Sequence, residues 1–443
     1  MPRSSTSSLD QVRAEQLARL RERLPEVLRG NRFWRERLHD VQGWDDFRRL
    51  PLTSKEDLVQ DQARHPPFGS NLTYPLESYV RVHQTSGSSG GRPLRWLDTA
   101  ESWEWWCRLW AEHVYAAAAV GPADRVFLAF SFGPFVGFWS AFAGAERLGA
   151  LVVSGGAMSS EQRIVTMLEL GATVLLCTPT YALRLAELAA EMGVDLAASA
   201  IRATIHAGEP GASVPATREA IERAYGAAAF DHTGMTELGP TGFSCAQRDG
   251  VHLIETEFVF EVLAQDPLPD PPRKGEGDVA ADPPRKGEGD LAVAARDEGE
   301  GELVATNLGR WGSPLFRYRT GDRVQLSRRP CGCGSTFPKL LGGLRGRVDD
   351  MVTVRGVNLF PSQVEDVVRR HPEIGEFVIE HRRVREMDEV TLLVECARGE
   401  APLAVLGVEL RNALGVRIVC RQVALGSLPR SELKARRLTR LPG

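Results

Sequence analysis

The chain has 443 residues, more than one hydrophobic core usually covers, so two or more domains are expected. Hydrophobic residues make up 43% and charged residues 25%, as in an ordinary globular protein. The formal net charge is −4, from 54 basic and 58 acidic residues, which gives no reason to expect binding to nucleic acid or to an anionic membrane.

The N-terminal segment and the cysteines favour a cytoplasmic protein. Residues 1–10 are rich in serine and lack the apolar centre of a secretory signal. No run of 18 uninterrupted apolar residues occurs, so no membrane span is expected. The seven cysteines are scattered and odd in number, unlike a disulfide framework, and a reducing compartment is expected.

Lysine is rare in this sequence. It occurs at Lys55, Lys274, Lys286, Lys339 and Lys434, and every other basic residue is an arginine. Because arginine supplies the ordinary surface charge, each lysine is a candidate for a role that arginine cannot fill.

Short-range patterns predict the first elements of the chain. Leucines at helical spacing among arginine and glutamate over residues 11–38 indicate an amphipathic helix pair. Thr53 and Glu56 have the spacing of a capping box, which predicts a helix that begins after Thr53. Alternating polar and apolar residues over 78–82 favour a strand.

The loop from His83 to Pro93 is the first candidate for chemistry. It carries hydroxyls and glycines in close succession, at Thr85, Ser86, Gly87, Ser88, Ser89, Gly90 and Gly91. Glycine lets backbone N–H groups turn inward and hydroxyls add donors, so the loop could wrap a polyphosphate. No Gly-Lys-Ser/Thr follows, which excludes the P-loop of the NTPases. A flexible surface linker is the alternative interpretation.

Residues 102–206 alternate between helical and strand patterns. Helices are predicted over 103–118, 138–148, 161–170 and 181–192, and strands over 125–130, 151–153, 173–177 and 203–206. This alternation implies a parallel sheet covered by helices on both faces. Ligands of such sheets bind at the carboxyl ends of the strands, so functional residues are expected in the loops that follow.

A segment of sequence Asp-Pro-Pro-Arg-Lys-Gly-Glu-Gly-Asp occurs twice, at 270–278 and 282–290. It is rich in proline, glycine and charge and has no apolar periodicity. We interpret residues 266–300 as a flexible, solvated loop insertion and not as a repeat architecture. Lys274 and Lys286 occupy equivalent places in the two copies, so neither is expected to be catalytic.

Residues 346–443 predict a separate small α+β domain, with its boundary near 346–350. Strands are expected over 352–354, 377–380, 391–396 and 416–420, and helices over 361–370 and 403–414. Pro361 suits the first position of its helix. The predicted fold class is therefore α/β, with a large N-terminal domain over 1–345 whose parallel or mixed sheets are flanked by helices.

Four more short motifs follow along the chain. They are Ala-Gly-Glu-Pro at 207–210, Asp-His-Thr-Gly-Met-Thr-Glu at 231–237, Tyr-Arg-Thr-Gly-Asp at 318–322 and Gly-Arg-Val-Asp-Asp at 346–350. Together with the loop at 83–93, they resemble the acyl-adenylate-forming superfamily of acyl-CoA ligases, adenylation domains and luciferases. Within it, Phe-Gly-Pro-Phe at 132–135, Thr-Pro-Thr-Tyr at 178–181 and Arg-Gly-Val-Asn-Leu-Phe-Pro-Ser at 355–362 resemble the phenylacetate–CoA ligase family. The resemblance spans residues 45–440.

The resemblance implies a reaction in two halves. A carboxylate attacks the α-phosphate of ATP to give an acyl-adenylate and pyrophosphate, and a thiol, usually that of CoA, then displaces AMP. It also implies that the C-terminal domain is mobile, that Asp349 is its hinge, and that it carries the catalytic Lys434. The family resemblance further suggests a homodimer.

The resemblance assigns nucleotide-binding roles as well. The β- and γ-phosphates would be held by Thr85, Ser86, Gly87, Ser88, Ser89 and Gly90. The rest of the nucleotide site would comprise Gly208, Glu209, Pro210, Asp231, His232 and Thr233, with Asp322 on the ribose and Arg347 near ribose and phosphate. Thr236 would touch the α-phosphate, and Glu237 would bind Mg²⁺, a hard cation suited to carboxylate oxygens.

Aromatic and small residues predict a flat apolar slot for the acyl group. The expected lining is Phe132, Phe135, Val136, Phe138, Ala207, Gly208 and Met235. This composition favours an aryl or arylacetic acid. The alternative, most relevant to Phe138, is that these side chains belong to the core.

A second group of residues has the chemistry of a structural zinc site. Three thiols and one imidazole, from Cys245, His252, Cys331 and Cys333, would suit tetrahedral Zn²⁺. Their spacing differs from the common C-x₂-C ribbons, and reduced thiols in loops are the alternative. Four further cysteines lie in apolar runs and are expected to be buried: Cys107, Cys177, Cys396 and Cys420.

Three functions compete at this point. The main hypothesis is an ATP-dependent aryl-CoA ligase. A stand-alone adenylation enzyme that loads an aryl acid onto a carrier-protein phosphopantetheine has the same motifs. A non-catalytic homologue that binds nucleotide or acyl ligand is disfavoured because Glu237, Asp322 and Lys434 are all present.

Overall fold

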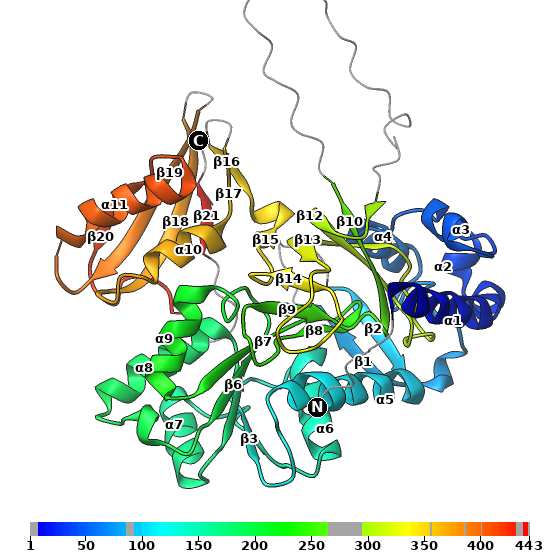
Figure 1. The fold of residues 1–443 in the computed structure, drawn as a ribbon, viewed down its shortest axis with the longest axis horizontal. Coiled ribbons are helices and arrows are strands. Elements are labelled where there is room, and N and C mark those ends of the chain that lie inside the picture. Colours follow the sequence, from blue (N-terminus) through cyan, green and yellow to red (C-terminus); the bar gives the residue numbers. More distant parts are fainter. Residues whose placement is uncertain are drawn as a thin grey trace, which may run out of the picture.

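The computed structural model describes residues 8–85, 93–264, 295–354, 357–384, 387–399, 401–430 and 437–441. These residues form a large N-terminal α/β part and a smaller C-terminal part beside it (Figure 1). The duplicated segment, Ser86 to Gly90 of the predicted phosphate loop, and Lys434 lie outside the described residues. Within the described ranges, no helix is long and apolar enough to cross a membrane.

The first helices of the chain are α1 (Leu9–Gly30), α2 (Arg32–Arg35), α3 (Trp44–Arg49) and α4 (Lys55–Arg64). The helix pair predicted over 11–38 is present as α1 and α2. They separate at Asn31, whose side chain accepts a hydrogen bond from the Trp34 amide at 3.2 Å and so caps α2.

The helix predicted after Thr53 is present as α4, but its capping box is shifted by one residue. Ser54 is the N-cap, and Asp57 closes the box by accepting from the Ser54 amide at 2.8 Å. Thr53 instead donates its hydroxyl to the Phe316 carbonyl at 2.9 Å. This ties the start of α4 to a distant part of the chain.

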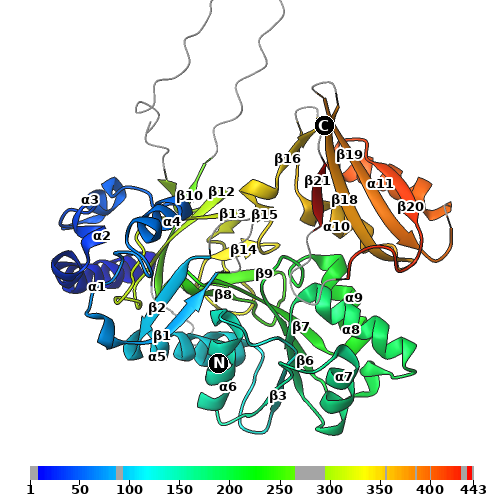
Figure 2. The ribbon, with the colours of Figure 1, turned by 180° about the vertical axis from the view of Figure 1, so that it is seen from behind.

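One mixed sheet, with thirteen strands among the described residues, organises the N-terminal part. Its parallel half contains, in spatial order, β7 (Ala228–Met235), β6 (Ala203–His206), β5 (Val174–Cys177), β3 (Arg125–Leu128) and β4 (Leu151–Ser154). One face carries α7 (Ser160–Glu169), α8 (Pro179–Glu191) and α9 (Pro215–Tyr225), and α5 (Ala100–Leu109) and α6 (Val136–Arg147) lie on the other side (Figure 1, and Figure 2 from behind). The predicted parallel sheet between helices is confirmed.

The other half of the sheet is antiparallel. It continues from β7 through β8 (Gly239–Phe243), β9 (Gly250–Leu253), β14 (Lys339–Leu341), β13 (Tyr318–Ser327), β12 (Gly299–Asn307), β10 (Phe258–Leu263) and β11 (Ala295–Arg296), and β15 (Gly346–Arg347) pairs with β13. A separate hairpin is formed by β1 (Tyr79–Gln84) and β2 (Arg95–Thr99). The long loop between β13 and β14 returns the chain to β9.

Two helices differ from their predicted limits. The helix predicted over 103–118 is α5 followed by a π-helical turn, Trp110–Tyr115. Helix α8 begins at Pro179, two residues early, because Thr178 caps it by accepting from the Tyr181 amide.

The C-terminal part contains a short hairpin of β16 (Val352–Val354) and β17 (Val357–Leu359) and a four-stranded sheet. The sheet has the order β20 (Val419–Val423), β19 (Met387–Cys396), β18 (Ile374–Val384) and β21 (Leu438–Leu441), with α10 (Pro361–Val368) and α11 (Ala401–Leu414). The strand predicted over 416–420 begins later, and β21 was not predicted. Cys420 is partly exposed and not buried as expected, whereas Cys107, Cys177 and Cys396 are buried.

Candidate active site

The tight turn between β7 and β8 carries Thr236 and Glu237. Thr236 is partly exposed, whereas the Glu237 side chain is buried. The Lys55 ammonium, in the first turn of α4, lies 3.8 Å from a Glu237 carboxylate oxygen. A buried carboxylate beside a single partly exposed cation could also hold a metal ion. Lys55 was not among the predicted site residues, although the rarity of lysine was a signal for it.

Asp231 and His232 are buried further along β7. The His232 amide donates to Asp231 Oδ1 at 3.0 Å, yet burial raises the pKa of Asp231 to about 6. Burial also lowers the pKa of His232 to about 4, while its Nδ1 lies 2.7 Å from the Gly242 carbonyl. The imidazole is therefore neutral at pH 7, and Asp231 holds a charge that its surroundings disfavour.

Asp322 and Arg347 face each other across β13 and β15. They are register partners, and the guanidinium lies 3.6 Å from a carboxylate oxygen of Asp322. Buried Tyr318 lies at the start of the same strand as Asp322. Burial raises the pKa of Tyr318, with further effects from Glu237, Arg347 and Asp322. Residues from two of the sequence motifs, Glu237 and Asp322, thus lie within electrostatic reach of one phenol.

In the region predicted to bind adenine, two sequence motifs are in contact. Gly208, after β6, has φ of +99°, a conformation that favours glycine. Glu209 accepts a hydrogen bond from the Thr180 amide at 2.9 Å, in the first turn of α8. The Gly-Glu-Pro and Thr-Pro-Thr-Tyr stretches are therefore joined at the carboxyl end of the parallel strands, where ligands of such sheets bind. Ala207 and Pro210 are partly exposed there.

The described edges of the phosphate-type loop are fixed by the β1–β2 hairpin. The Thr85 amide donates to the Leu94 carbonyl at 2.9 Å, and the Leu94 amide donates to the Thr85 hydroxyl at 3.1 Å. Thr85 thus closes the base of the loop, and a hydroxyl that accepts one hydrogen bond can also donate one to a ligand.

The predicted acyl-pocket residues separate into two groups. Val136 and Phe138 are buried in the large core, with the Phe138 ring stacked 3.8 Å from that of Phe130. Phe132 and Met235 are only partly buried and pack against the same core. Phe135, Ala207 and Gly208 also keep exposed surface. A core role explains Phe138 without a ligand, while Phe132 and Met235 remain the better candidates for contacting substrate.

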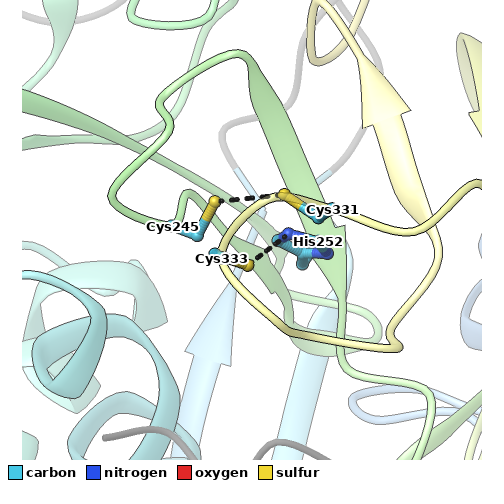
Figure 3. Close-up of side chains that lie close together, drawn as sticks. All are labelled: Cys245, His252, Cys331 and Cys333. Carbon is cyan, nitrogen blue, oxygen red and sulfur yellow. Dashed lines mark hydrogen bonds between the residues drawn. The ribbon is translucent and has the colours of Figure 1, made fainter.

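The predicted metal ligands converge. The ligand atoms of Cys245, His252, Cys331 and Cys333 all lie within 4.8 Å of one another (Figure 3). Cys245 Sγ is 3.8 Å from Cys331 Sγ, and Cys333 Sγ is 3.5 Å from His252 Nε2. In a tetrahedral zinc site, bond lengths place two sulfurs about 3.8 Å apart and a sulfur and a nitrogen about 3.6 Å apart. Both measured distances fit.

Groups around these four side chains also suit a metal. His252 Nδ1 lies 2.9 Å from the Phe337 carbonyl, which orients the ring with Nε2 toward the thiols. The Lys339 ammonium lies 3.7 Å from Cys331 Sγ and 2.7 Å from Asp249. Three thiolates around Zn²⁺ leave one negative charge, and the Lys339 ammonium, shared between Cys331 and Asp249, would offset part of it.

Known proteins resemble this chain over most of its length. The family of AMP-binding enzyme C-terminal domains matches residues 356–440. A phenylacetate–coenzyme A ligase of Thermus thermophilus is 31% identical over 408 residues, which cover 89% of this chain and 83% of that protein. A 2-hydroxyisobutyryl-CoA ligase in its postadenylation state, in complex with R3-HIB-AMP, is 30% identical. The superposition of the two structures has a TM-score of 0.86 and covers 99% of this chain and 91% of the ligase.

The same ligase in its thioesterification state, with 2-HIB-AMP and CoA, is again 30% identical and covers 100% of this chain and 92% of that one. Its TM-score is lower, at 0.70. Because the ligase is the same in both, its arrangement of parts accounts for the difference. The arrangement in this chain resembles the postadenylation structure more closely.

Proposed function

The chain belongs to the phenylacetate–coenzyme A ligase family, and from this premise we propose that it joins an aromatic carboxylic acid to CoA through an acyl-adenylate. It is an AMP-forming acid–thiol ligase that uses ATP and CoA. The acid's carboxylate attacks the α-phosphate of ATP and pyrophosphate leaves. The CoA thiol then attacks the acyl carbon, and AMP leaves.

One observation supports this site most strongly: Glu237 and Asp322, from separate motifs, are both buried carboxylates that act on the pKa of buried Tyr318. Asp322, with Arg347 beside it, would accept hydrogen bonds from the ribose hydroxyls. Thr236, partly exposed next to Glu237, would donate its hydroxyl to the α-phosphate. Adenine would lie between Glu209, Asp231 and their neighbours, at the carboxyl ends of β6 and β7.

Glu237 fits the requirement for a Mg²⁺ ligand because its buried carboxylate has only a distant ammonium, that of Lys55, as its ion-pair partner among the described residues. Bound there, the cation would neutralise charge on the phosphates. Lys55 would then move away from the carboxylate, toward the phosphates or solvent. Lys434 would add a cation between the carboxylate and the α-phosphate, where charge gathers in the transition state.

An aryl or arylacetic acid is the proposed substrate because Phe132, in the loop after β3, and Met235, at the end of β7, both keep partly exposed apolar surface. The test is a pyrophosphate-release screen over benzoates, aminobenzoates, hydroxybenzoates and arylacetates, with acetate, palmitate and 2-hydroxyisobutyrate as competitors. Aryl acids should give the highest kcat/KM. A clear preference for any of the three aliphatic acids would refute this substrate class.

The acceptor is tested in the same assay. The acyl-adenylate should pass its acyl group to free CoA, and a thioester product should appear with AMP. Transfer to a carrier-protein phosphopantetheine but not to CoA would instead favour a stand-alone adenylation enzyme.

We also propose a structural zinc ion on Cys245, His252, Cys331 and Cys333. It would tie the β13–β14 loop to the ends of β8 and β9, because all four ligands come from these segments. Ser244, next to Cys245, exchanges two hydrogen bonds with the backbone of Asp231. The ion would therefore stabilise the frame beneath the nucleotide site without taking part in the reaction.

A further inference from the structure

A charged pair is completely buried beneath the β7–β8 turn. Asp98, on β2, and Arg310, in the loop after β12, are both 0% exposed. The guanidinium binds the carboxylate through two parallel hydrogen bonds of 2.7 Å, from Nε and Nη2. It also lies between the rings of Trp96 and Trp106, at 5.3 and 5.0 Å from their centroids. These contacts fix the plane of the guanidinium.

The third nitrogen of Arg310 points at the proposed catalytic turn. Its Nη1 donates to the backbone carbonyls of Thr236, at 2.5 Å, and Glu237, at 3.1 Å. These residues carry the side chains assigned to the α-phosphate and to Mg²⁺. Fixing both carbonyls fixes the backbone of the tight turn, and with it the Cα–Cβ bonds from which the hydroxyl and the carboxylate extend.

The carboxylate end of the pair belongs to the hairpin that bounds the phosphate-type loop. Asp98 lies on β2, which leaves the loop at Leu94, and β1 enters the loop at Thr85. His83, also on β1, places its Nδ1 3.6 Å from Asp98. The pair thus bridges two segments that would hold different ends of the triphosphate.

A gain in stability does not by itself explain why a charged pair is buried here. Replacing a buried ion pair by well-packed apolar side chains is often neutral or stabilising. A bidentate pair instead fixes the relative orientation of its partners, because the planar fork of arginine can bind one carboxylate and two carbonyls at once. The three donors of lysine radiate from one nitrogen, so they cannot reproduce bonds that come from three separate nitrogens of a planar guanidinium.

We propose that Arg310 and Asp98 are positioning residues that hold the Thr236–Glu237 turn in register with the β1–β2 hairpin that bounds the phosphate-type loop. The inference builds on the proposed function, since it gives the turn and the loop their roles. It predicts that loosening the pair weakens the binding of metal-bound ATP and slows adenylate formation. Thioester formation from pre-formed adenylate needs no triphosphate, so it should be preserved.

The test is Arg310→Lys, compared with wild type in two measurements. The first is ATP affinity titrated against Mg²⁺ with no acid present. The half-saturating Mg²⁺ concentration and the Kd for ATP should both rise about tenfold or more. The second is the rate of CoA transfer to pre-formed acyl-adenylate, which should stay within about twofold of wild type. If Arg310→Lys does not fold, Asp98→Asn carries the same test, because it keeps the side-chain volume and removes the charge.

Arg202→Lys is the matched control. Arg202 also makes a two-pronged bond to a carboxylate, Asp124, at 3.0 and 2.7 Å, and donates to the carbonyls of Ala118 and Ala119. Its turn has no assigned role, so this variant should lose stability and keep the wild-type Mg²⁺ dependence. Unchanged Mg²⁺ and ATP affinity in Arg310→Lys, or equal slowing of both half-reactions, would overturn the proposal. A wild type that binds ATP but activates no acid would refute the proposed function alone.

Discussion

Replacing Asp231 by asparagine should stabilise the free enzyme at neutral pH. The residue is 5% exposed, and burial raises the pKa of its carboxyl from 3.8 to about 6. At pH 7 the wild type therefore holds a carboxylate where the neutral acid is favoured. The two pKa values differ by about two units, which corresponds to about 3 kcal/mol of unfolding free energy.

The sign of the pH dependence follows from proton binding. Between about pH 4 and about pH 6, the folded protein keeps a proton on Asp231 that the unfolded chain has released. This contribution to the unfolding free energy falls as the pH rises through that window and stays low above it. Asparagine does not titrate, so the advantage of Asp231→Asn should grow from near zero below pH 4 to about 3 kcal/mol above pH 6.

Urea unfolding without nucleotide, at pH 4 and at pH 7.5, measures this difference. Asp124→Asn is a control of opposite sign: burial raises the pKa of Asp124, but its hydrogen bonds, chiefly with Arg202, lower it overall. That variant should be less stable than wild type at both pH values, because a carboxyl with a lowered pKa loses its stabilising charge only as the pH falls below about 4. An Asp231→Asn protein that gains nothing at pH 7.5, or gains equally at both pH values, would refute the reasoning.

Three further predictions concern zinc, the hinge and the catalytic lysine. Protein purified without chelator should carry about one Zn²⁺ per chain. The Cys333→Ser variant should lose the zinc and melt at lower temperature. The Cys420→Ser variant, changed outside the cluster, should keep the zinc. Metal analysis that finds no zinc in the wild type ends that proposal. Asp349→Pro should slow thioester formation much more than adenylate formation, because proline fixes φ near −65° at the proposed hinge; equal losses would count against a hinge there. Lys434→Ala should slow adenylate formation ~10²–10³-fold and leave much of the CoA step measured with pre-formed adenylate, and an adenylation rate near wild type would contradict this role.

Local sequence patterns predicted the parallel half of the sheet well. Four of its five strands, β3, β4, β5 and β6, are short apolar runs that are each followed by an amphipathic helix, and both periods are visible without knowledge of distant residues. Errors fell at the helix ends, where a single side chain decides. Thr178 starts α8 early, and Ser54 displaces Thr53 as the cap of α4.

The site could be predicted only in part, because its long-range contacts leave no local trace. Residue type marked the cysteines and His252 as ligands, but only the return of the β13–β14 loop to β9 brings them together. Asp98 and Arg310 are 212 positions apart, and nothing near either residue in the sequence distinguishes it. Lys55 had a signal in its rarity, yet the tertiary contact was needed to pair it with Glu237.

The two kinds of contact in this structure suggest how a fixed nucleotide site and a moving domain can coexist. Asp98, Arg310 and the β7–β8 turn all belong to the N-terminal part, so they would keep their geometry whatever the C-terminal part does. Among the described residues, contacts between the parts include the packing of α10 against α9, a hydrogen bond from Ser362 to the Arg345 carbonyl, and the Arg323 guanidinium 5.4 Å from the Phe360 ring centroid. Such surface contacts can be exchanged at modest cost, unlike a buried bidentate pair. We therefore expect rotation near Asp349 to carry Lys434 away after adenylation while Thr236 and Glu237 stay in place.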